Sequence, residues 1–96
     1  MTAPARVPRQ WRRPSSEGAH RLAWWLCAND ARWNEIERAA EISPAVIDRL
    51  LSGEVAPSAD LAEAIAQISA GDVLPMDWER AATCGWDARP AAREVA

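Results

Sequence analysis

Two short amphipathic segments separated by only three residues constrain this chain more than any other feature of its sequence. The first segment, 31–40, carries apolar residues at helical spacing, and the second runs from Pro44 to Ser52. Within the connection 41–43, Ser43 is a good N-cap, and Pro44 suits the first helical position because its missing N–H costs nothing there. Helices this short are not stable alone, so they must pack at a steep angle against other helices. The sequence therefore predicts a helical domain built around this pair.

Further helices are predicted on both sides of the pair. A helix over 17–29 follows Ser16 as a possible cap, and another over 58–69 follows Pro57 and ends at Gly71. A last short helix, with Asp77 as its cap, carries Trp78. The residues expected to face inward are Leu22, Trp25, Leu26, Trp33, Ile36, Ala40, Ile47, Leu50, Leu51, Leu61, Ile65 and Ile68. Because no strand pattern occurs, we expect an all-α bundle of four to five helices.

The length of 96 residues allows one domain with tails. We expect a flexible basic arm over 1–15, rich in Pro and Arg, a helical domain over 16–82 and an irregular tail over 83–96, docked by Trp86. Residues 1–21 hold five Arg and one Glu, whereas residues 22–96 hold six Arg and thirteen acidic residues. The positive charge is therefore concentrated at the start of an otherwise acidic chain.

Several function classes have no support in the sequence. Cys27 and Cys84 lie far apart without a CxxC pair, and His20 is the one histidine, so neither a disulfide framework nor a metal site is expected. The longest apolar stretch, 22–28, is too short to span a membrane. No converging acid, base or nucleophile and no glycine-rich phosphate loop is present. We expect a soluble, cytoplasmic protein that is not an enzyme and needs no cofactor.

The segment IERAAEISPAVIDRLLSG, from Ile36 to Gly53, and the following PSADLAEAIAQISAGDVLPMDW carry a family resemblance. They resemble the Cro/repressor-type helix-turn-helix family of small phage-type regulators, particularly its YdaS-like members. The resemblance covers about residues 17 to 80. It implies a lambda-repressor-like fold and sequence-specific binding of double-stranded DNA by a homodimer, with the helix 44–52 in the major groove.

The resemblance also assigns roles to individual residues. In that family the third helix faces base edges, and the start of the second helix approaches a phosphate. Arg49 is then expected to bind a guanine, and Ala45 or Val46 to touch a thymine methyl group. Asn34 and Arg32 are expected near phosphate oxygens. The groove-facing residues implied by the resemblance are Ser43, Ala45, Val46, Asp48 and Arg49.

This chain departs from the family pattern at positions that affect DNA binding. Glu41 stands where the family commonly has Gly, and a non-glycine residue at positive φ there costs about 1–3 kcal/mol. Glu37 replaces a small residue and must point outward or find a partner such as Arg49. Asp48 is an acidic residue at a position where the family usually has a small polar residue. Ser52 stands where the family often has a basic residue that binds a phosphate. The departures at Asp48 and Ser52 weaken the electrostatic attraction to DNA.

Two features outside the helix pair bear on partners. Arg9, Arg12 and Arg13 in the basic arm are expected to enter a minor groove, with a merely solubilising tail as the alternative. Trp24 falls off the inward face of its helix, so we expect it to be exposed and to contact a partner, such as the second copy in a dimer. An isolated surface aromatic residue is the alternative.

These observations favour a DNA-binding transcriptional regulator of phage or prophage type. The alternative is a protein-binding module on the same fold, whose acidic residues at 37, 41, 48 and 54 bind another regulator or a polymerase subunit. A fold resemblance does not by itself decide between them.

Overall fold

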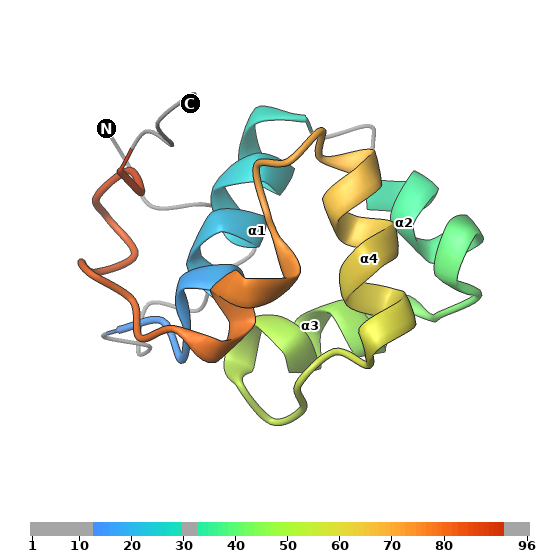
Figure 1. The fold of residues 1–96 in the computed structure, drawn as a ribbon, viewed down its shortest axis with the longest axis horizontal. Helices are drawn as coiled ribbons and strands as arrows, with labels where there is room; N and C mark the ends of the chain where they lie inside the picture. The colour runs from blue at the N-terminus through green and yellow to red at the C-terminus, as the bar shows by residue number, and fades with distance from the viewer. Residues whose placement is uncertain (1–12, 30–32, 92–96) are drawn as a thin grey trace.

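The structure is a computed structural model that describes residues 13–29 and 33–91. Four α-helices and one 3₁₀-helix are joined by turns and loops (Figure 1). They are α1 (Glu17–Ala28), α2 (Trp33–Ala40), α3 (Pro44–Ser52), α4 (Ala59–Ile68) and the 3₁₀-helix η2 (Pro75–Glu79). No strand occurs in the described ranges, so the predicted all-α class is confirmed. α3 lies along one edge of the molecule, below α1 and α4 in the view of Figure 1.

Serine side chains cap two of the helices at their N-termini, as predicted. The Ser16 hydroxyl accepts a hydrogen bond from the Ala19 N–H at 3.0 Å, and the Ser58 hydroxyl accepts one from the Leu61 N–H at 3.2 Å. Each bond satisfies a donor that the helix itself leaves unpaired. Ser43 has the extended backbone of an N-cap, but its hydroxyl makes no capping bond.

Left-handed residues end two of the helices. Gly53 follows α3 with a φ of 85°, which confirms its predicted role. After α4, both Ala70 (φ 54°) and Gly71 (φ 87°) are left-handed, and the Gly71 N–H bonds to the Ala66 carbonyl at 2.9 Å. Gly71 alone was expected to close this helix; instead Ala70 takes the first left-handed position.

The last helix differs from the prediction in type and in its cap. η2 is a 3₁₀-helix that starts at Pro75, with Leu74 in the capping position. Asp77 lies inside the helix, and its Oδ2 accepts a hydrogen bond from the Leu74 N–H at 2.8 Å. The prediction of Asp77 as the N-cap was therefore wrong, because this carboxylate reaches back to the chain from the third helical position.

The core is formed where α1 meets α3 and η2 and where α2 meets α4. A Cβ at Gly18 would overlap the Trp78 ring, so the glycine lets η2 approach α1 closely. Trp86 is 2% exposed although it belongs to a segment without regular structure, which confirms that it docks this segment. The buried hydrophobic cluster comprises Ala19, Leu22, Ala23, Trp25, Leu26, Ile36, Ile47, Leu50, Leu51, Leu61, Ile65, Val73 and Trp86.

Candidate nucleic-acid interface

α3 is amphipathic, and its polar face lies at the surface. Its inward positions Ile47, Leu50 and Leu51 are each at most 1% exposed. Residues three and four apart share a helix face, so the intervening positions point outward. Of the residues predicted to read DNA, Ser43, Ala45, Asp48 and Arg49 are exposed. The structure therefore brings these four together on one accessible surface, which we call the α3 face.

Val46 is placed differently from the other residues predicted to read DNA. It is half-buried and packs against the hydrophobic core, alongside Ile42. Its β-branched side chain thus contributes to holding α3 in place. Val46 was predicted to face the groove together with its neighbours, and its partial burial reflects a position that borders the buried stripe of α3.

The turn between α2 and α3 contains the strained residue that the sequence indicated. Glu41 has a φ of 56°, in the left-handed region that favours glycine. The Ile42 N–H bonds to the Glu37 carbonyl at 3.0 Å, which closes α2 in the manner of a Schellman motif. Ile42 packs against the core, and this contact offsets part of the cost of the turn.

Arg49 pairs with Glu54, and not with Glu37 as considered above. The Arg49 Nε lies 3.7 Å from the Glu54 Oε2, and the two side chains are 59% and 69% exposed. Glu37 is half-buried, and its Oε2 is buried without a hydrogen bond. Arg49 is accessible on the α3 face, but it lies beside a carboxylate.

Exposed acidic residues occur at both ends of α3 and on the helix itself. Glu41, Asp48 and Glu54 are all exposed on or beside α3. Because DNA carries a dense negative charge, three carboxylates at this surface oppose its approach. The described part of the α3 face therefore needs further cations to bind a duplex tightly.

Of the residues predicted to contact phosphates or to enter a minor groove, only Asn34 and Arg13 belong to the described part of the chain. Asn34 is exposed at the start of α2. Arg32, Arg9 and Arg12 lie outside the described residues. Arg13 is exposed, but its Nη2 donates to the Ala82 carbonyl at 3.2 Å, so it also ties the start of the chain to the loop after η2.

The start of the described chain lies beside the C-terminal end of α3. A Cβ built at Gly53 would stand 2.6 Å from the Ser15 Cβ, so the two residues are in close contact. The chain before Arg13, which holds Arg6, Arg9 and Arg12, lies outside the described residues.

The exposure predicted for Trp24 was wrong. Trp24 is 9% exposed, and its Nε1 donates to the Trp86 carbonyl at 3.0 Å. The Arg89 guanidinium lies 5.6 Å from the centre of the Trp24 ring. The segment 84–91 covers this side of α1 and buries the indole, so Trp24 offers no exposed surface for a second copy in this conformation.

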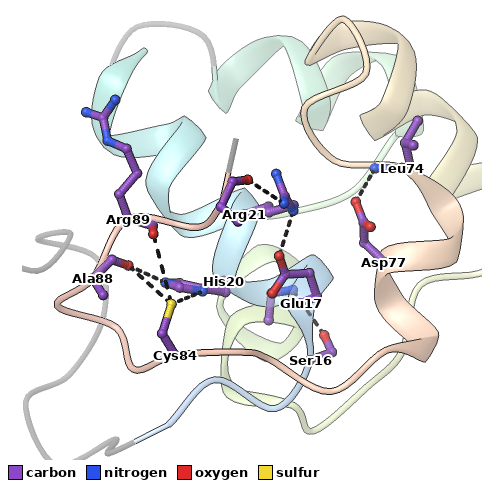
Figure 2. Close-up of polar contacts among 11 residues, drawn as sticks. Ser16, Glu17, His20, Arg21, Leu74, Asp77, Cys84, Ala88 and Arg89 are labelled. Atoms are coloured by element: carbon purple, nitrogen blue, oxygen red, sulfur yellow. Dashed lines mark hydrogen bonds and ion pairs between the residues drawn. The ribbon is translucent and has the colours of Figure 1, made fainter. Parts of the chain in front are cut away.

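The sequence reasoning missed the way in which α1 holds this C-terminal segment. The His20 Nε2 donates to the Ala88 carbonyl at 2.7 Å, a contact marked in Figure 2. The Arg21 Nη2 donates to the Ala91 carbonyl at 2.7 Å. Arg21 also forms an ion pair with Glu17 at 2.8 Å. Together with the Trp24 bond, three α1 side chains bind three backbone carbonyls. Every residue has a backbone carbonyl, so no sequence pattern in residues 84–91 predicts these contacts.

His20 is fully buried in this arrangement. Its Nδ1 faces the Cys84 Sγ at 3.9 Å, and its ring meets the Trp86 ring edge-on at 6.0 Å. Because a carbonyl can only accept, Nε2 carries the proton and Nδ1 is the acceptor in the neutral ring. Burial lowers the pKa of His20 from its ordinary value, against the opposing effects of the Ala88 hydrogen bond and Glu17. The imidazole therefore acts here as a neutral structural group.

The structure defines the class of the protein at the level of its fold: a small all-α helical domain. No family model, no curated protein and no solved structure matches the chain. Within the described residues, no helix has the length and apolar character needed to cross a membrane. The same part of the chain contains no group of three or more side chains suited to hold a metal ion.

Proposed function

We propose that this protein is a sequence-specific DNA-binding transcriptional regulator of phage or prophage type. The α3 face carries the proposal, because it presents Ala45, Asp48 and Arg49 outward on a helix whose opposite side is anchored in the core. An exposed helix of this width fits the major groove of B-DNA. The regulator would act in the cytoplasm, associated with the nucleoid when bound.

Each residue of the α3 face has a chemical role in this proposal. The Arg49 guanidinium can donate two hydrogen bonds to O6 and N7 of a guanine. The Ala45 methyl group can contact a thymine methyl, and Asp48 can accept from the N4 amino group of a cytosine. Asn34 would contact a phosphate at the start of α2. As a homodimer, the protein would read two half-sites across a two-fold operator.

Selection of bound fragments from random duplexes, followed by fluorescence anisotropy on the enriched sequence, tests the proposal. The affinity should fall steeply with salt concentration, because phosphate contacts release counterions. Substitution R49A should cost about 1–3 kcal/mol of binding free energy and relax the preference at one base pair. A weak affinity with a flat salt response would count against DNA binding.

A second candidate function is supported by the exposed acidic residues on and beside α3. With Glu41, Asp48 and Glu54 exposed, the same surface suits a basic patch on another regulator or on a polymerase subunit. In that case E41Q and D48N should weaken binding of the partner, whereas R49A should not. The protein should then pass through heparin and duplex columns without retention.

A further inference from the structure

The ion pair between Arg49 and Glu54 spans the C-terminal end of α3. The Arg49 Nε lies 3.7 Å from the Glu54 Oε2, and both side chains are mostly exposed. Arg49 belongs to the α3 face, whereas Glu54 follows the left-handed Gly53 in the loop toward α4. The pair therefore links the residue proposed to bind guanine with a carboxylate outside the helix.

Backbone geometry keeps Glu54 close to Arg49. The Val55 N–H bonds to the Arg49 carbonyl at 3.4 Å, and the Ser52 hydroxyl donates to the same carbonyl at 3.1 Å. The Ser52 hydroxyl also accepts from the Glu54 N–H at 3.4 Å. These bonds fold the chain back over the last turn of α3. The position of Glu54 is thus set by the helix end and not only by attraction between the two side chains.

A carboxylate and the major-groove edge of guanine compete for the same donors. Both present two acceptors at a spacing that suits the planar guanidinium fork. Arg49 cannot lose its charge, so its donors are satisfied by one partner or the other, or by water. Because the pair is exposed, it is weak enough to exchange.

We propose that Glu54 is an intramolecular competitor of DNA for Arg49, an inference that rests on the proposed function. In the free protein Glu54 holds the guanidinium at the end of α3. In the complex a guanine displaces the carboxylate, and only a duplex that supplies suitable acceptors offsets the loss of the ion pair. Glu54 thereby lowers the overall affinity for DNA and makes the binding of Arg49 conditional on the base it meets.

A double-mutant cycle on the full-length protein tests this role. The probe is the duplex enriched by selection, and its affinity is measured for the wild type, E54Q, R49A and the double variant. E54Q should raise the affinity about two- to fivefold, the range expected for an exposed ion pair. In the R49A background this gain should shrink toward the part that comes only from removing a negative charge near DNA.

Glu41 provides the matched control, since it is an exposed carboxylate in the turn before α3. E41Q should change the affinity by the same factor whether Arg49 is present or absent. Equal effects of E54Q in both backgrounds would overturn the role of Glu54 while leaving DNA binding intact. A folded wild type that enriches no duplex would overturn the proposed function itself, and this role with it. Circular dichroism of each variant verifies that the helices are retained.

Discussion

The indole N–H of Trp24 donates to the backbone carbonyl of Trp86 at 3.0 Å, across a separation of 62 positions in the chain. This bond joins α1 to a segment without regular secondary structure. The Trp86 side chain is buried in the core on the same side. The C-terminal segment is therefore an integral part of the domain, and it covers the side of α1 that was predicted to contact a second copy.

The Trp24 bond predicts a difference between two tryptophan-to-phenylalanine variants. W24F removes the donor to the buried carbonyl, so it should lower the free energy of unfolding by about 0.5–1.5 kcal/mol beyond the loss of ring volume. W78F is the control, because the Trp78 Nε1 is buried without a hydrogen bond. Its loss should be smaller than that of W24F when both are measured by urea unfolding. A larger loss for W78F would contradict the assigned contacts.

The buried His20 predicts that stability decreases in mild acid. Burial lowers the pKa of His20 below 6.5 in the folded state, so the unfolded chain binds the proton more tightly. The contribution is fully present above about pH 6.5 and is lost as the pH falls toward the lower pKa of the folded state. Urea unfolding at about pH 7 and about pH 5.5 measures this slope.

The variant H20Q isolates the contribution of the imidazole. Glutamine does not titrate, and its amide retains a donor for the Ala88 carbonyl that His20 binds. The slope between the two pH values should therefore be smaller in H20Q than in the wild type. An equal slope in both proteins would show that other groups cause the pH dependence.

The contact of Gly53 with Ser15 predicts that two glycine substitutions differ in cost. Alanine at Gly71 meets no atom within 4 Å, so G71A should cost only the strain of a left-handed alanine, about 1–2 kcal/mol. Alanine at Gly53 has the same strain and also overlaps the Ser15 side chain. G53A should therefore lower the melting temperature more than G71A does. Equal shifts would argue against the packing of Ser15 on the end of α3.

Removal of residues 1–12 tests the contribution of the basic arm to DNA binding. The deletion takes away Arg6, Arg9 and Arg12 but keeps Arg13, which contacts the Ala82 carbonyl. Each arginine that contacts a phosphate should reduce the slope of log affinity against log salt by about 0.9. Anisotropy across a salt series provides the measurement. An unchanged slope would mean that the arm does not contact DNA and serves only solubility.

The four α-helices were predictable because their signals are local. The Ser16 and Ser58 caps, the proline at the start of α3 and Gly53 at its end all act within one helical turn, and the structure places the boundaries of these α-helices within about two residues of those expected. The apolar stripe of α3 likewise gave the correct inward residues. The exposure of Arg49 followed from this stripe, since a residue between buried positions points outward.

Contacts between distant segments were not predictable. Trp24 lies off the stripe that the spacing on α1 defines, and nothing near it in the sequence indicates that residues 84–91 would cover it. The partner of Arg49 was also missed, because Glu54 approaches it through the reversal at Gly53 and not through helix spacing. Such pairings depend on which earlier residues the chain approaches after it reverses direction at a turn.

The order of residues alone determined where the four α-helices start and stop and which face of α3 avoids water, because capping and amphipathic spacing act over a few residues. The tertiary structure alone decided which side chains meet across the chain: the carbonyls of the C-terminal segment with α1, and Ser15 with the end of α3. The physical reason is that every residue carries a backbone carbonyl and that a glycine does not indicate which residue will pack against it. The partners of these groups are set only when the fold brings distant segments together.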